Sequence, residues 1–208
     1  MTRAFVIVGT DTNVGKTVFS AALVGALGAF YWKPVQSGLE DETDSQTVAR
    51  LSGVAPSCIL PEAWRLKLPA SPHIAARAEG VEINPVELVP PKVDGPLVIE
   101  TAGGVMVPLT DDVLTIDLLA RWRQPVILVA RTSLGTINHS LLTLEALRRR
   151  DIPIHGITFM GDEQKAPQET IARLGEVRVL GRLPRLDSLT QETLREAFAA
   201  SFSPGDFT

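Results

Sequence analysis

The chain reads Gly9-Thr10-Asp11-Thr12-Asn13-Val14-Gly15-Lys16-Thr17 between the apolar run Ala4–Val8 and a helix-compatible segment that begins at Val18. A loop that ends in Gly-Lys-Thr at the start of a helix is typical of a phosphate cradle, because free backbone N–H groups and the helix dipole face the anion. Lys16 is placed to reach terminal phosphates, and the Thr17 hydroxyl can ligate Mg2+. The first glycine, Gly9, comes one position earlier than the common pattern requires. The alternative, a plain turn that opens a surface helix, fits the preceding strand poorly.

Beyond this loop, apolar segments alternate with helical patterns along the chain. The expected strands are Ala4–Val8, Tyr31–Val35, Leu97–Glu100, Val126–Ala130, Ile154–Met160 and Val177–Leu180. The expected helices cover about residues 17–27, 43–52, 72–79, 115–123, 136–150, 166–174 and 188–202. Ser71-Pro72 and Asn84-Pro85 are capped boundaries, and the proline-rich stretch Val54–Pro96 is expected to be irregular in part. Strand alternating with helix predicts an α/β fold with a parallel sheet and right-handed crossovers.

The composition favours a single soluble, cytoplasmic domain over residues 1–208. Hydrophobic residues make up 45% of the chain and charged residues 21%, which suits one substantial core. The net charge of −4 leaves no basic footprint for nucleic acid. Cys58 is the sole cysteine and cannot form an intramolecular disulfide, which fits a reducing compartment. No apolar segment reads as a signal peptide or reaches the ~20 residues of a membrane span, so a membrane is not an expected partner. Nucleic acid is not expected either, because the chain lacks a basic footprint.

Charged residues stand at the ends of two expected strands, which is where ligands bind in open α/β sheets. Lys33 precedes the loop Gln36-Ser37-Gly38, and a lysine at a buried strand end is costly unless an anion or a carboxylate pairs with it. The alternative is a lysine whose head reaches solvent. Glu100 precedes Gly103-Gly104, whose backbone can approach a ligand closely. Both ends are therefore candidate functional sites.

Asp44 opens the expected helix near residues 43–52 and completes a candidate metal site. On its own, an acid in the first turn of a helix is a cap that the helix dipole favours. Mg2+ prefers oxygen ligands from one or two carboxylates together with phosphate oxygens and water. Thr17, Asp44 and Glu100 therefore make a plausible set of Mg2+ ligands.

The segment Leu134–His139 follows the strand Val126–Ala130 and begins a long helix. The free N–H groups of Thr136, Ile137 and Asn138 could receive a substrate carboxylate. The alternative is an ordinary strand-to-helix turn. His139 is interpreted as a packing residue and not as a catalytic base.

Five motifs in register resemble the dethiobiotin synthetase family, over about residues 4–145, with a weaker echo at Gly181–Pro184. They are Gly9–Thr17, Lys33-Pro34-Val35-x-Ser37-Gly38, Ser71-Pro72-His73, Glu100-x-Ala102-Gly103-Gly104 and Leu134-Gly135-x-Ile137-Asn138-His139. The resemblance implies a P-loop NTPase-like three-layer fold with a mostly parallel central sheet flanked by helices. It also implies a Mg2+-dependent enzyme that uses ATP and CO2 to close a cyclic urea on 7,8-diaminononanoate, and a homodimer.

The resemblance also implies residue roles. Lys33, Lys16 and Thr12 are the expected catalytic residues, and Thr17, Asp44 and Glu100 are expected to hold Mg2+. The expected ATP-binding residues are Thr12, Asn13, Val14, Gly15, Lys16, Thr17, Val18, Glu100, Gly103 and Gly161. The expected substrate-binding residues are Ser37, Gly104, Thr136, Ile137 and Asn138, with the substrate carboxylate at Thr136–Asn138 near a subunit boundary.

The chain departs from the family pattern at three places. One is a short C-terminal region, which leaves the rest of the nucleobase pocket without assigned residues. Thr101 stands where the family often has glycine after the strand-end glutamate. The chain reads Phe159-Met160-Gly161-Asp162 where relatives carry an asparagine for adenine. Met160 offers only apolar contact and Gly161 only backbone, so discrimination between nucleobases by side chains is expected to be weak.

Three other functions fit the residues less well. Partition-type or arsenical-pump-type ATPases carry a second lysine near the start of the loop, where this chain has Asp11. An amidotransferase of the cobyrinate type needs a glutaminase domain, for which 208 residues leave no room. A non-catalytic nucleotide-binding scaffold would give Lys33 and Glu100 no purpose.

Overall fold

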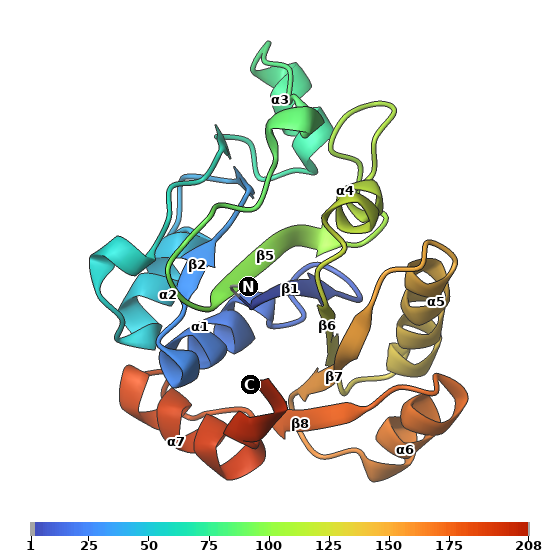
Figure 1. Cartoon of the computed structure of the whole chain (residues 1–208). Helices are drawn as coiled ribbons and strands as arrows, with labels where there is room; N and C mark the ends of the chain where they lie inside the picture. The colour runs from blue at the N-terminus through green and yellow to red at the C-terminus, as the bar shows by residue number, and fades with distance from the viewer. Residues whose placement is uncertain (1–2, 208) are drawn as a thin grey trace.

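The computed structural model describes residues 3–207. A parallel sheet of six strands forms its centre, and Figure 1 shows how the helices surround it. The strand order is β2-β5-β1-β6-β7-β8, and every pairing between neighbours is parallel. The strands are β1 (Ala4–Gly9), β2 (Phe30–Trp32), β5 (Leu97–Gly104), β6 (Val126–Arg131), β7 (Ile154–Met160) and β8 (Val179–Leu183). A separate two-stranded parallel sheet joins β3 (Val35–Ser37) to β4 (Trp64–Leu66).

Within residues 3–207, seven α-helices connect the strands and cover both faces of the sheet (Figure 1). They are α1 (Lys16–Leu27), α2 (Asp44–Ser52), α3 (Pro72–Ala78), α4 (Thr115–Trp122), α5 (Thr136–Arg148), α6 (Lys165–Leu174) and α7 (Gln191–Ser201). Strands buried on both faces read as continuous apolar runs, which is why the strand segments stand out in the sequence. The arrangement confirms the expected three-layer α/β fold.

Two hydrophobic cores lie on opposite faces of the sheet because successive residues of a strand point to opposite sides. In β1, Val6 and Val8 belong to the core shared with α4, α5 and α6, whereas Phe5 and Ile7 belong to the core shared with α1, α2 and α7. Two aromatic rings close the second core, where Phe198 of α7 stacks on Phe202, directly after this helix, with centroids 4.5 Å apart. The sheet is thereby held between two packed layers, and its carboxyl ends remain open for ligands.

The expected single strand Tyr31–Val35 is wrong. The chain leaves the main sheet after Trp32 and joins the small sheet at Val35. Pro34 stands at the break, where it has no N–H to donate to a ladder and its carbonyl accepts from Trp64 N–H at 3.0 Å. The division places Lys33 at the junction of two sheets.

Smaller differences concern the ends of elements. The last expected strand, at Val177–Leu180, lies at Val179–Leu183, and the last helix begins at Gln191. Asn84-Pro85 begins only a 3-10 turn, Pro85–Glu87, in which the Asn84 side chain accepts from Val86 N–H. Strand β4 lies in the stretch that was expected to be partly irregular. Within residues 3–207, no helix has the length and apolar character that crossing a bilayer requires.

Candidate active site

The loop after β1 has the backbone shape of a phosphate cradle. Asn13 and Gly15 take left-handed conformations, with φ of 56° and 99°, and α1 begins at Lys16 with no side-chain cap and no acidic residue in its first turn. Its first N–H groups and the positive end of its dipole are therefore available to an anion. A Cβ on Gly9 would lie 2.6 Å from the Asp11 carbonyl oxygen and 2.9 Å from Lys16 Nζ. This tight passage explains why the first glycine stands at position 9.

Lys16 is a buried cation on this loop. Its Nζ donates to the carbonyl oxygen of Asp11 at 3.0 Å. Burial lowers the pKa of Lys16 to about 8, because desolvation and the nearby Lys33 outweigh the attraction of Glu100, Asp44 and Asp11. A partly desolvated lysine with so few partners interacts strongly with any phosphate that enters the loop.

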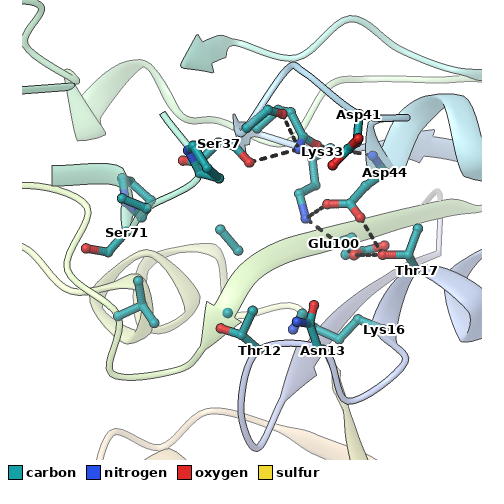
Figure 2. A pocket seen from close by; sticks show the side chains of 18 of the residues that line it. Thr12, Asn13, Lys16, Thr17, Lys33, Ser37, Asp41, Asp44, Ser71 and Glu100 are labelled. Carbon is teal, nitrogen blue, oxygen red and sulfur yellow. Dashed lines mark hydrogen bonds and ion pairs between the residues drawn. The ribbon is translucent and has the colours of Figure 1, made fainter. Parts of the chain in front are cut away.

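A cluster of charges lies beside the loop, where β2, α1, α2 and β5 meet (Figure 2). Lys33 is 3% exposed and Glu100 1% exposed. Lys33 Nζ lies 2.5 Å from Asp44 Oδ2 and 3.3 Å from Glu100 Oε1. The Tyr31 hydroxyl donates to Glu100 Oε2 at 3.0 Å. Lys33 therefore pairs with two carboxylates, as the sequence predicted for a lysine at a buried strand end. Its ammonium group does not reach solvent.

The ionisation of this cluster follows from its burial. Burial alone would lower the pKa of Lys33, but Glu100 and Asp44 outweigh it and hold the pKa of Lys33 above its ordinary value. Burial alone would raise the pKa of Asp44, but Lys33 and the Thr17 hydroxyl hold it below its ordinary value. Burial is the largest cause, and the negative charge of Glu100 the second, of a pKa of Tyr31 well above its ordinary value. The site therefore holds a lysinium and an Asp44 carboxylate at neutral pH, with Tyr31 protonated.

The oxygen atoms of Thr17, Asp44 and Glu100 form a donor set that fits Mg2+. Thr17 Oγ1 lies 2.6 Å from Asp44 Oδ1 and 2.9 Å from Glu100 Oε1. A hydroxyl has one proton, so it cannot donate to both carboxylates at once. No group of three or more His, Cys, Asp or Glu side chains that could hold a metal occurs among residues 3–207. A Mg2+ ion here would thus rely on two carboxylates, one hydroxyl, ligand phosphates and water, which is a usual arrangement for this ion.

The loop and the charge cluster open into one cavity of about 830 Å³. Among the residues expected from the sequence, those that line it are Thr12, Asn13, Gly15, Lys16, Thr17, Val18, Lys33, Ser37, Asp44, Glu100 and Gly103. Further lining residues that the sequence reasoning did not assign to the site are Gln36, Gly38, Glu40, Asp41, Glu42, Pro69, Ala70, Ser71, Pro72, Ala102 and Val107. Ser71-Pro72 carried a signal as a capped helix start, whereas Pro69-Ala70 carried none.

Six expected residues do not line this cavity. Val14 is buried in the core against α1, and Gly104 lies against the backbone of Gly9 and Thr10. Thr136–Asn138 begin α5, where Thr136 is buried. Gly161 follows β7, and its carbonyl oxygen accepts from Arg182 at 2.8 Å.

Two of the departures from the family pattern have visible contacts. Thr101 is buried, and its hydroxyl donates to the carbonyl oxygen of Ile7 at 3.2 Å, so it ties β5 to β1. Met160 lies against the phosphate loop, since a Cβ on Gly15 would approach Met160 Cγ to 2.9 Å. Thr101 thus contacts the strand that precedes the loop, and Met160 contacts the loop itself.

Comparison with known proteins places these features in a family. The model of the family described as an AAA domain matches residues 3–193. Relatives described as "ATP-dependent dethiobiotin synthetase BioD" are 62% identical in Agrobacterium fabrum and Rhizorhabdus wittichii and 58% identical in Rhodopseudomonas palustris. Each alignment covers 100% of this chain, and 98%, 99% and 97% of the three relatives respectively.

Solved structures share the fold at low identity. A ParA family ATPase from Chlorobium tepidum aligns with a TM-score of 0.57 at 14% identity, over 96% of this chain and 98% of that one. The MinC:MinD cell division complex of Aquifex aeolicus aligns with a TM-score of 0.53 at 13% identity, over 94% and 86%. These likenesses confirm the P-loop NTPase-like fold and say nothing of the reaction.

Proposed function

The chain belongs to the ATP-dependent dethiobiotin synthetase family, and on that premise we propose how its site makes dethiobiotin from 7,8-diaminononanoate, CO2 and ATP. One neutral amine attacks CO2 and loses a proton, which gives a carbamate. A carbamate oxygen attacks the γ-phosphorus of ATP, the bond to the bridging oxygen breaks, and ADP leaves. The second amine attacks the carbonyl carbon of this carbamic-phosphoric anhydride. Phosphate then leaves with the C–O bond electrons, the amine loses a proton, and the cyclic urea closes.

The observation that carries the proposal is the pair of lysines at the cavity. Lys16 on the phosphate loop and Lys33 between two carboxylates both line the space where the loop and the charge cluster meet. Phosphoryl transfer depends on positioning and charge neutralisation more than on covalent help from the protein. Lys16 and Thr12 hold the phosphates and the carbamate, Lys33 neutralises the carbamate and the transferring phosphoryl group, and Ser37 orients the carbamate.

Thr17, Asp44 and Glu100 would hold Mg2+, which, when bound, neutralises phosphate charge during the transfer. The remaining ATP contacts that we propose are the backbone of Asn13–Val18, with Gly103 and Gly161. Loop N–H groups support this assignment because α1 starts without a cap of its own. Gly104 is proposed to contact the substrate from β5.

We further propose that residues 1–208 form one domain that acts as a cytoplasmic homodimer, without nucleic acid or membrane partners. The α5 N-terminus, Thr136–Asn138, is proposed to receive the substrate carboxylate near the subunit boundary. Leu134, two residues before this helix, is fully exposed and is therefore available to contact a second subunit. Light scattering tests the dimer, and a fully active monomer at assay concentration would refute it.

The decisive experiment is the substrate dependence of phosphate release from Mg-ATP. We expect release to require both diaminononanoate and bicarbonate as the source of CO2, with dethiobiotin formed in equal amount. Hydrolysis that proceeds without either substrate would instead indicate a regulatory ATPase switch. Such switches carry a second lysine where this chain has Asp11, whose carboxylate accepts from Arg131 at 2.8 Å. An acidic residue at this position supports the synthetase assignment.

A further inference from the structure

Gln36 is a buried amide at the centre of β3 that lines the cavity but has no part in the chemistry above. The residue is 6% exposed. Its Nε2 donates to the carbonyl oxygens of Ser37 and Gly38, each at 3.2 Å. Its Oε1 accepts from the N–H of Asp44 at 3.3 Å. All three partners are backbone groups.

The chemistry of these partners determines how the amide is oriented. Asp44 presents a donor, so it must meet the oxygen of Gln36, and the two carbonyls present acceptors, so they must meet the NH2 group. Both N–H bonds of the side chain are consumed by the backbone. Gln36 therefore acts on the site through the chain segments that it joins, and not as a donor to the ligand.

One of these segments is a wall of the cavity. Ser37 and Gly38 both line it, and the Gly38 N–H donates to the carbonyl oxygen of Leu66 in β4 at 2.9 Å. Gly38 takes φ of 87°, a left-handed conformation that a glycine adopts readily. The wall is thus held by β4, through the carbonyl oxygen of Leu66, and by the side chain of Gln36.

The other segment is the start of α2. Asp44 is the first residue of this helix, so its N–H has no partner within the helix. The capping box of Thr43 and Gln46 satisfies the N–H groups of those two residues but not that of Asp44. Gln36, in strand β3, supplies the missing acceptor. The Asp44 carboxylate, one side chain away, contacts both Thr17 and Lys33.

We propose that Gln36 is a positioning residue that holds the Asp44 carboxylate where Mg-nucleotide binding needs it, by tying the start of α2 to the Ser37–Gly38 wall. The inference rests on the proposed role of Asp44 as a metal ligand. The direction of the Asp44 side chain depends on its backbone, so a loosened N–H shifts both carboxylate oxygens. Losing a partner that orients a ligand typically costs 10–100-fold in metal affinity, and we expect about tenfold here because the tie acts through the backbone.

The test compares two glutamines at the same helix start. Gln36→Met removes the tie while keeping the length of the side chain, and Gln46→Met removes the capping box, which does not reach the cavity. The readout is the affinity for Mn2+ in the presence of ADP, measured by electron paramagnetic resonance on protein whose fold is checked by circular dichroism. Gln36→Asn, which keeps the amide but is too short to span both segments, serves as the second variant if methionine disturbs folding.

We expect Gln36→Met and Gln36→Asn to weaken Mn2+ binding about tenfold, and Gln46→Met to lower the melting temperature with less than a twofold change in binding. Equal weakening by the Gln36 and Gln46 variants would overturn the proposal, because it would show a general loosening of the helix. Unchanged binding in the Gln36 variants, with Asp44→Asn weakened, would also overturn it. If Asp44→Asn itself binds Mn2+ normally, the metal assignment under the proposed function fails first.

Discussion

The phosphate end of the site and the segments proposed as its far end differ in how completely their polar groups are paired and buried. The phosphate end comprises Gly9–Thr17 with Lys33, Asp44 and Glu100, and its two strand-end charges are buried and bonded to each other. The proposed far end, which does not line the cavity, comprises Leu134–Asn138 after β6 and Met160–Asp162 from the last residue of β7. There, Leu134 is fully exposed, and Asp162 meets Arg185 at 3.6 Å between two exposed side chains.

This difference indicates where the binding energy and the rate come from. Charges fixed in a buried site need no reorganisation when the reaction places charge beside them, so they stabilise the transferring phosphoryl group strongly. Exposed ion pairs contribute about 0–1 kcal/mol. We therefore expect substitutions at the phosphate end to change turnover by orders of magnitude. Changes at the proposed far end should affect mainly which nucleotide the protein uses.

The largest expected effect is that of Lys33→Ala. We expect dethiobiotin formation to fall by about two to three orders of magnitude, because the carbamate and the phosphoryl group lose their neutralising charge. The variant should also lose about 3–5 kcal/mol of unfolding free energy, since Asp44 and Glu100 are left without their cation. Lys16→Ala should lose turnover similarly but keep most stability, because Lys16 bonds only a carbonyl oxygen.

Turnover and urea unfolding of both lysine variants test this contrast. Arg50→Ala is the matched control, as Arg50 pairs with Glu42 at an exposed surface. Near-normal turnover in folded Lys33→Ala would sink the assignment of the phosphate end.

The next effect concerns the metal. We expect Asp44→Asn and Glu100→Gln each to raise the Mg2+ concentration for half-maximal turnover by about 10–100-fold, since both carboxylates face one ion with Thr17. The double variant should add little to the larger single effect, because ligands of one ion act as a unit. Mg2+ titrations of the three variants decide this. If Asp44→Asn lowers only the melting temperature, Asp44 is a helix cap and nothing more.

A third test uses pH. The pKa of Lys16 is lowered to about 8, so the free protein loses this positive charge as pH rises through 8. We expect kcat/KM for ATP to fall by up to about tenfold per pH unit above 8, while kcat stays flatter because bound phosphates keep Lys16 protonated. Lys16→Arg should lack the fall, since arginine stays charged. Parallel profiles of kcat and kcat/KM would argue against Lys16 as the group that titrates.

The smallest effect is expected at the far end, where the nucleobase would lie. The Gly161 carbonyl is taken by Arg182, and Met160 packs on the loop, so few side-chain groups remain to read the base. We expect GTP and CTP to support turnover within about tenfold of ATP, a gap of about 1.4 kcal/mol. The comparison of kcat/KM for ATP, CTP, GTP and UTP checks this. A thousandfold preference for ATP would contradict this expectation, because it would show that side chains at the far end recognise the base. Asp162 would be the first candidate, since its carboxylate can accept from an exocyclic amine.

Local sequence by itself determined the strand, loop and helix at the N-terminus and the alternation that follows. Residues 9–17 are contiguous, so their glycines, lysine and threonine specify the cradle without help from distant parts of the chain. The strands were readable because burial on both faces requires unbroken apolar runs. The identities of Lys33, Asp44 and Glu100 were likewise visible, because each charge follows or opens a recognisable element.

Only the tertiary structure decided how those charges meet. The contacts of Thr17 with Asp44 and Glu100 span 27 and 83 residues, and periodicity carries no information about which distant side chains become neighbours. The division of Tyr31–Val35 between two sheets was hidden for the same reason: β3 pairs with the distant β4, and the N–H of Trp64 donates to the carbonyl oxygen of Pro34. The tie made by Gln36 joins backbone groups whose positions exist only after both sheets have formed. Local patterns thus specify which elements form, and long-range packing specifies which of their polar groups share a site.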